Sequence, residues 1–243
     1  MTDNSLTYAH PPIVEATVEL RIGGRIPDDD VDKLQRLLAP EYAKVEPVTE
    51  FLIAFSLDGT QPPPPPPTGK KYKLTSENGA WIVQLGASSV ALSNLAPYVG
   101  WLDFQKQFRC VYTIWRRVVG KRPVERLGMR YINRVDIPGN VVKPEEWFTV
   151  YSQFPDELGL SANEAQSVIA GTLNQEIGVK IATALVPPAL IDHLSLVLDI
   201  DVFHTAVAVK GDDEVWAAIG ALHDQKNRVF ESCITDRTRE LFR

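Results

Sequence analysis

The chain is poor in cysteine and has no long apolar run. Its two cysteines, Cys110 and Cys233, are far apart in the sequence, and we expect both to be reduced thiols. No Cys-x-x-Cys pair or other metal-ligand spacing occurs, so we assign no metal and no cofactor. No apolar stretch approaches the roughly 20 residues of a membrane span, and residues 1–12 lack the pattern of a signal peptide. We therefore expect a soluble, cytoplasmic protein with no membrane partner.

Basic residues are also scarce relative to acidic ones. The 243 residues include 25 Lys and Arg against 31 Asp and Glu, which gives a formal net charge of −6. Proteins that bind nucleic acid obtain most of their non-specific affinity from basic side chains that contact phosphates. The charge balance therefore disfavours a nucleic-acid partner.

Familiar catalytic motifs are missing as well. The sequence contains no GxGxxG or GxxxxGK[ST] loop, no HExxH helix and no GxSxG elbow. We therefore assign no catalytic residue and favour a binding protein over an enzyme.

The composition that remains is that of a globular protein, with 44% hydrophobic and 23% charged residues. Two units with the same predicted order of elements, residues 1–120 and 121–243, follow each other. Each begins with an alternating strand and continues with a helix, three or four strands and a long helix. Among these elements we expect a strand at 49–59 and a short helix at 143–154.

Long helices on one face of an antiparallel sheet are the economical packing for such elements. We predict an α+β fold in which the two halves form one continuous antiparallel sheet backed by helices, as one pseudo-twofold unit. This order of elements resembles the TATA-binding-protein-like and helix-grip architectures, a resemblance that carries no function by itself.

The stretch 126–137 alternates between core-type residues and arginines. One face of the predicted strand carries the apolar side chains and one amide: Leu127, Met129, Tyr131, Asn133 and Val135. The opposite face carries Arg126, Arg130 and Arg134. Glu15 and Glu19 lie on the corresponding face of the first strand of the other half. If these two strands are neighbours, Glu–Arg pairs should form between them.

This arginine face has two interpretations. It can be a ladder of salt bridges on an exposed sheet. It can also bind an anion or phosphate, because three arginines against two glutamates leave one positive charge unbalanced. Asp199 and Asp201, which share a strand face with Ser195, join the candidate binding residues, although no third ligand completes a Mg²⁺ site.

The C-terminal helical region is a second candidate surface. The candidate interaction residues of the helix are His223, Asn227, Phe230 and Asp236.

Residues 62–67 are six consecutive prolines, which favour a stiff polyproline II segment. We interpret this run as a rigid spacer, with docking to a proline-binding module as the alternative.

Three stretches together resemble a known family. They are HPPIVEATVEL at 10–20, RLGMRYINRVDI at 126–137 and HDQKNRVFESCITDRTRELF at 223–242. The combination resembles a sporadically distributed bacterial family of uncharacterised proteins, and the similarity spans the whole chain. The resemblance implies a bacterial cytoplasmic protein without an assigned reaction. Its patchy distribution suggests mobile or defence-associated genes.

Two hypotheses about function follow. In the first, the chain is a non-enzymatic interaction module in a defence or toxin–antitoxin-like system. It would bind a protein partner or another copy of itself through the sheet face or the last helix. In the second, it is a small-molecule or nucleotide-binding domain, which could be enzymatic, with an arginine-lined anion site on the sheet face.

Overall fold

The computed structural model describes residues 8–48, 69–139, 143–153, 155, 157, 165–188, 190–204 and 211–243. The predicted strand at 49–59 and the proline run at 62–67 lie outside these residues. The strands are β1 (Ile13–Ile22), β2 (Lys44–Pro47), β3 (Tyr72–Thr75), β4 (Trp81–Leu85), β5 (Ser89–Leu95), β6 (Val124–Pro138), β7 (Gln166–Thr172), β8 (Ile177–Val186) and β9 (His193–His204). The helices are α1 (Asp28–Leu38), α2 (Trp101–Val119), the 3-10 helix η1 (Pro144–Glu146), α3 (Asp212–Cys233) and α4 (Asp236–Glu240).

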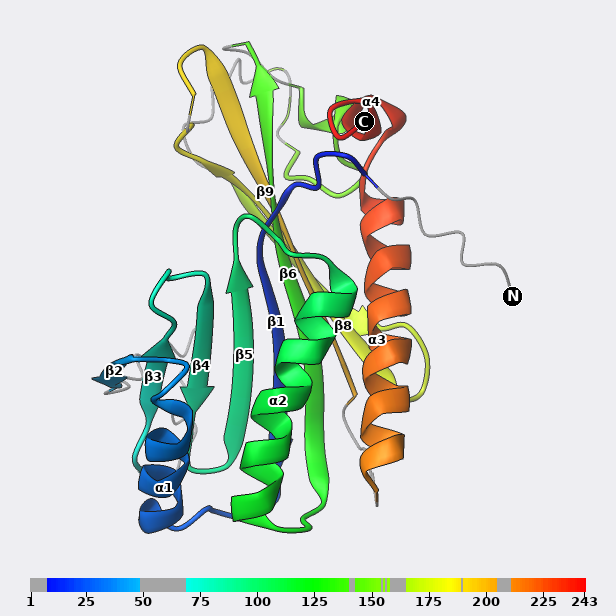
Figure 1. The fold of residues 1–243 in the computed structure, drawn as a ribbon. Coiled ribbons are helices and arrows are strands. Elements are labelled where there is room, and N and C mark those ends of the chain that lie inside the picture. The colour runs from blue at the N-terminus through cyan, green and yellow to red at the C-terminus, as the bar shows by residue number, and fades with distance from the viewer. Residues whose placement is uncertain are drawn as a thin grey trace, which may run out of the picture.

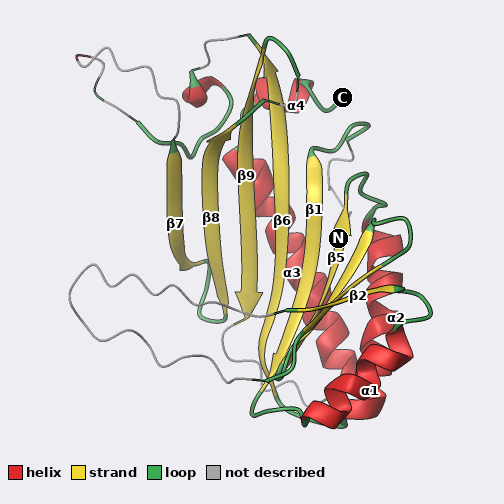
Figure 2. Ribbon diagram, turned by 90° about the vertical axis from the view of Figure 1, so that its left-hand side faces the viewer, coloured by secondary structure: helices red, strands yellow, loops and turns green. Residues whose placement is uncertain are grey.

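Within the described ranges, all the strands belong to one antiparallel sheet of order β2-β3-β4-β5-β1-β6-β9-β8-β7 (Figure 1). Helices α1, α2 and α3 lie on one face of this sheet (Figure 2). The predicted α+β class, with a continuous antiparallel sheet backed by helices, is confirmed. No helix in the part of the chain that the structure describes combines the length and apolar character needed to cross a bilayer.

The first strands of the two halves meet at the centre of the sheet. β1 and β6 are antiparallel neighbours, with Thr17 opposite Arg130 and Val18 opposite Met129. Outward from this junction, the strands follow the order β1-β5-β4-β3-β2 on one side and β6-β9-β8-β7 on the other. Both sides thus place their first strand beside their last one. The division of the chain at residue 120 stays a prediction.

The core lies between the sheet and the helices. The inward face of β6 predicted from alternation is buried, and it consists of Leu127, Met129, Tyr131, Asn133 and Val135. On β1 the buried residues are Ala16, Val18, Leu20 and Ile22. Helix α2 contributes to the same core with apolar residues spaced by three or four positions: Phe104, Phe108, Val111 and Trp115. Helix α3 packs over β6 and β9. Helix α2 ends at Gly120, whose φ of 74° is a left-handed conformation that residues other than glycine rarely adopt.

Two predicted helical stretches differ from the structure. In the described part of the predicted helix at 143–154, the only helical segment is the single turn η1, because the next residues pair with the end of α3 instead. Phe148 forms an isolated β-bridge with Ile234, and the Thr149 N–H donates to the Cys233 carbonyl. The C-terminal helical region is also interrupted at Ile234, whose backbone is extended. A new helix, α4, starts after Thr235, whose hydroxyl accepts from the Thr238 N–H.

Candidate functional site

The arginine face contains a network of ion pairs on the side of the sheet opposite the core. Arg126 Nη1 donates to Glu19 at 2.6 Å, and its Nη2 donates to Asp201 at 2.8 Å. Its guanidinium group also lies over the Phe203 ring, 4.7 Å from the centroid. The expected Glu–Arg pairing between β1 and β6 is therefore confirmed for Glu19.

The other two arginines have partners that were not expected. Arg130 binds both carboxylate oxygens of Asp199, at 2.8 and 2.6 Å. Arg134 donates to Asp136 at 3.0 Å and to the Ser195 hydroxyl at 2.9 Å. The pairing expected for Glu15 was wrong.

Glu15 accepts hydrogen bonds from the hydroxyl groups of Thr17 and Ser93 instead. The expected surplus positive charge was wrong as well, because aspartates of β6 and β9 also lie on this face. These acids occupy the guanidinium groups that an anion would need. Anion binding by the arginine face therefore stays a prediction, with the salt-bridge interpretation favoured by the geometry.

Gly128 makes room for the Arg126 guanidinium. An ideal Cβ at Gly128 would lie 2.9 Å from Arg126 Cζ, which is closer than real contacts allow. A side chain at position 128 would therefore force the Arg126 guanidinium to shift from its place between Glu19 and Asp201. Burial raises the pKa of Asp201 above its usual value, while the charges of Arg126 and Arg130 act in the opposite direction.

Of the candidate residues of the C-terminal helical region, Phe230 is buried and His223 and Asn227 are partly buried. His223 stacks on Trp101, with ring centroids 4.0 Å apart. Phe230 is buried and packs against Tyr8 and Phe242. Asn227 accepts a hydrogen bond from Lys226. Of the four predicted contact residues, only Asp236 is almost fully exposed, and it forms an ion pair with Arg239.

A buried lysine was missed by sequence reasoning. Lys226 is 6% exposed and lies on the inner side of α3, with Nζ 4.0 Å from the centroid of the Tyr131 ring. Burial lowers its pKa to about 7, and the more distant Glu231 opposes this shift. The Tyr131 hydroxyl is 2.9 Å from the Tyr98 hydroxyl. Helical spacing could have predicted its burial, because Lys226 follows the buried Leu222 by four residues and therefore lies on the same face of α3.

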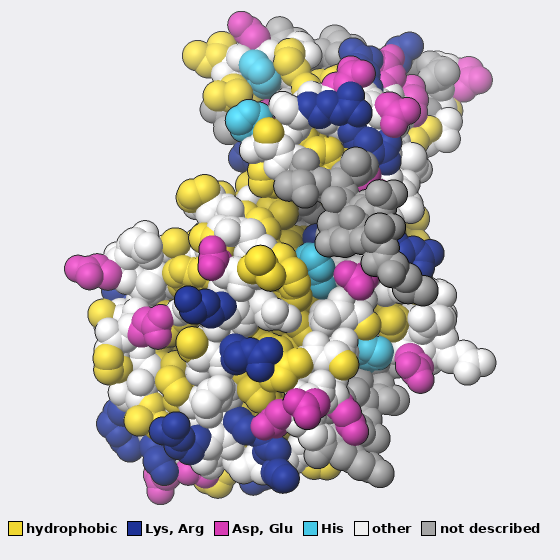
Figure 3. All heavy atoms as spheres, turned by 45° about the vertical axis from the view of Figure 1, so that its right-hand side comes forward, with side chains coloured by type: hydrophobic (Ala, Val, Ile, Leu, Met, Phe, Trp, Pro, Cys, Tyr) yellow, Lys and Arg dark blue, Asp and Glu magenta, His cyan; other side chains and the backbone are white. Residues whose placement is uncertain are grey.

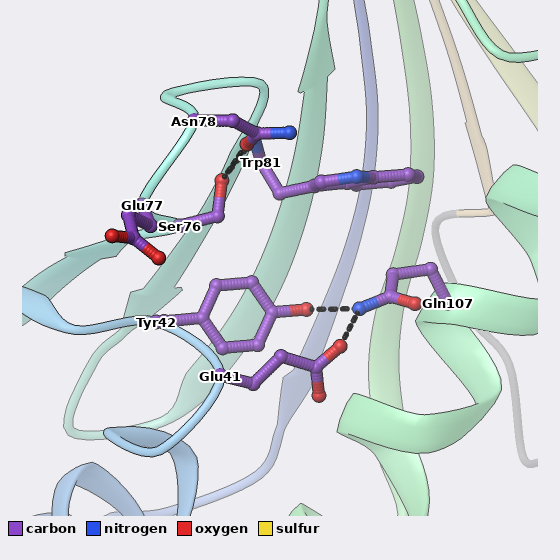
Figure 4. A pocket seen from close by; sticks show the side chains of 7 residues that line it. All are labelled: Glu41, Tyr42, Ser76, Glu77, Asn78, Trp81 and Gln107. Carbon is purple, nitrogen blue, oxygen red and sulfur yellow. Dashed lines mark hydrogen bonds between the residues drawn. The ribbon is translucent and has the colours of Figure 1, made fainter.

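An open pocket of about 460 Å³ lies near the β3–β4 end of the sheet (Figure 4). We call it the Trp81 pocket; its lining residues are Glu41, Tyr42, Ser76, Glu77, Asn78, Trp81 and Gln107. They come from the segment after α1, the β3–β4 turn, the start of β4 and helix α2. The volume is within the range of small-molecule sites. No lining residue is a lysine, arginine or histidine, whereas two are glutamates.

The β3–β4 turn holds Trp81 in place. The Ser76 hydroxyl donates to Asn78 Oδ1 at 2.7 Å and accepts from the backbone N–H of Trp81 at 3.0 Å. Gly79 takes the left-handed conformation that this turn requires. The indole is stacked parallel to the buried Phe104 ring, with centroids 6.0 Å apart. A hydrogen-bonded turn and a core aromatic thus fix the orientation of the indole.

The wall opposite Trp81 is a hydrogen-bonded row. Gln107 Nε2 donates to the Tyr42 hydroxyl at 2.9 Å and also to Glu41 (Figure 4). Tyr42 is fully buried, so it holds the Gln107 amide in place rather than reaching a ligand itself. Burial raises the pKa of Tyr42 well above its usual value, which keeps the phenol protonated. Glu41, Glu77 and Asn78 are exposed.

Two further observations limit the assignment of function. Within the described ranges, no three His, Cys, Asp or Glu side chains lie close enough together to hold a metal ion. On the side shown in Figure 3, basic and acidic side chains both occur, with apolar side chains between them.

No protein-family model matches the chain, and a comparison with curated proteins finds no match. The resemblance to a sporadically distributed bacterial family therefore stays a prediction.

Proposed function

We propose that this chain is a non-catalytic binding protein and that its ligand occupies the Trp81 pocket. The observation that carries the proposal is a partly exposed indole, fixed by the turn and Phe104, facing the row formed by Gln107 and Glu41 (Figure 4). Binding sites for small molecules combine such an aromatic wall with a few positioned polar groups.

The chemistry of the pocket supports binding rather than catalysis. The Ser76 hydroxyl accepts from the backbone N–H of Trp81 and donates its proton to the Asn78 amide oxygen, which is not a base that could activate it as a nucleophile. Tyr42 is protonated and buried, so it cannot act as a general base near neutral pH. This agrees with the missing catalytic motifs.

The proposal is tested by a metabolite screen with two readouts. A ligand at 100 times its Kd should raise the free energy of unfolding by about 2.7 kcal/mol. Hits are then added to protein labelled at the indole nitrogens, and the Trp81 resonance is assigned with Trp81→Phe. Hits that shift the Trp81 resonance support the proposal. If all hits shift only the other tryptophans, the pocket is not the binding site.

Binding of a protein is a second candidate function, and β7 is the observation that favours it. Among the described residues, β7 pairs only with β8, so its other edge has no strand beside it. It contains no charged residue and no proline, and Val168 and Ile169 are each 50% exposed. Natural proteins usually protect such edges with charge or proline. An unprotected edge supports a protein partner or a second copy of this chain.

A further inference from the structure

We propose that the Trp81 pocket recognises an organic cation, a guanidinium or alkylammonium group. This inference rests on the proposed function, because it names the ligand class of the same pocket. Glu41 and Glu77 give the lining two negative charges and no positive one. A cation can therefore enter without displacing a basic side chain, whereas an anion would meet two carboxylates.

The hydrogen bonds within the lining point to a ligand rich in donors. Gln107 Nε2 already donates to Tyr42 and Glu41, and the Ser76 hydroxyl already donates to Asn78. These two groups already donate inside the wall, and the donors that the lining still offers, such as the Asn78 amide, are neutral. The two carboxylates can accept up to about four hydrogen bonds each. Guanidinium and ammonium groups carry only donors, so they match this arrangement.

The indole adds a second basis for selecting a cation. Tryptophan is the best aromatic partner for a cation placed over its ring, and such contacts gain strength where water is excluded. The indole lines the pocket and is partly exposed, so part of its surface is open to a ligand while Phe104 stacks parallel to it. A planar guanidinium can lie on an indole while its N–H groups point outward to carboxylates.

The cation can come from a free small molecule or from a basic side chain of a peptide. Two pairs of probes separate charge from shape and distinguish these sources. Ethylguanidinium and its neutral isostere ethylurea represent the free ligand. Acetyl-Gly-Arg-Gly-amide and the same peptide with citrulline in place of arginine represent the peptide. Each probe is titrated into the full chain while the indole resonances are followed.

We expect both cations to shift the Trp81 resonance and to bind at least about tenfold more tightly than their neutral isosteres, because charge-assisted hydrogen bonds are lost in the isosteres. The double variant Glu41→Gln with Glu77→Gln should reduce cation affinity by about tenfold or more, while its unfolding temperature stays near wild type. Glu145→Gln, an exposed acid on η1 outside the pocket, serves as the matched control and should bind like wild type.

Equal binding of cation and isostere, or unchanged cation binding in the double variant, overturns the cation class. The proposed function survives that result if the probes or the screening hits still shift Trp81. If neither cation shifts Trp81, the class also fails. The proposed function itself fails only if, in addition, no hit of the metabolite screen shifts the Trp81 resonance. A peptide affinity at least about tenfold above that of ethylguanidinium assigns the cation to a protein partner, because neighbouring residues then add contacts.

Discussion

Lys226 Nζ lies 4.0 Å from the centroid of the Tyr131 ring, inside the layer between α3 and the sheet. The contact places a cation on the face of an aromatic ring, and the Lys226 ammonium donates its hydrogen bond to the neutral Asn227 amide rather than to a carboxylate. A cation–π contact offsets only part of the cost of burying a charge. Lys226 should therefore make the stability of the protein depend on pH.

The sign of this dependence follows from the lowered pKa. In the folded chain the pKa of Lys226 is about 7, below the 10.5 of the free side chain. Between these values the unfolded chain binds more protons, so the free energy of unfolding should rise as pH increases from 7 toward 10.5. Lys226→Met should remove this rise and stabilise the protein at pH 6 by about 1–3 kcal/mol. Urea unfolding of both proteins at pH 6, 7.5 and 9 measures the difference, and parallel pH profiles would contradict it.

Arg126 should matter more for stability than Arg130. Arg126→Gln removes the partner of both Glu19 and Asp201 and should cost about 2–3 kcal/mol, because two partly buried carboxylates lose their counter-charge. Arg130→Gln breaks a pair whose arginine side chain is 50% exposed and should cost under about 1 kcal/mol. Urea unfolding at neutral pH compares the two variants, and equal losses would count against the distinction.

Gly128→Ala should disturb the same ion pairs. The added methyl group would collide with the Arg126 guanidinium and push it away from Glu19 and Asp201. We expect a loss of about 1–3 kcal/mol, and in combination with Arg126→Gln we expect much less than the sum of the two effects. Gly171→Ala on β7 is the matched control, because a Cβ there meets nothing within 4 Å. Additive losses would show that Gly128 acts through another contact.

The edge of β7 should promote self-association. The opposite edge strand, β2, contains Lys44, Glu46 and Pro47, which hinder pairing, whereas β7 has no such residues. Changing both Val168 and Ile169 to Lys should weaken association by roughly tenfold or more, because charge on an edge strand opposes strand pairing. Sedimentation velocity over a range of protein concentrations measures this. Leu102→Lys, at an apolar residue 79% exposed on α2, is the control. A wild-type chain that stays monomeric throughout would rule out self-association through β7.

The sequence was informative about features that depend only on the alternation of residues along a single strand. Alternation along β1 and β6 was sufficient to separate core residues from charged ones, and it placed Glu19 and Arg126 on the same face. It could not show that Asp199 would bind Arg130, because that pair depends on β9 lying beside β6. Neighbours in a sheet that are far apart in sequence are set by topology, which a local pattern does not contain.

The Trp81 pocket could not be predicted for the same reason. Glu41, Asn78 and Gln107 come from three separate segments, and none belongs to a recognised motif. Only the packing of α1 and α2 on the sheet brings them together. The single-turn η1 shows the reverse case, because residues 143–154 have a helical pattern that pairing with the end of α3 overrides.

The pairing of β1 with β6 also affects how the chain can fold during its synthesis on the ribosome. Glu19 and Arg126 pair across it although 107 positions separate them. At typical synthesis rates of about 5–20 residues per second, β1 emerges roughly 5–20 seconds before its central partner exists. During that interval one edge of β1 has no native neighbour. That edge is then open to non-native strand pairing with nascent chains on neighbouring ribosomes. The exposed edge of β1 is therefore covered only once the ribosome has synthesised β6 in the second half of the chain.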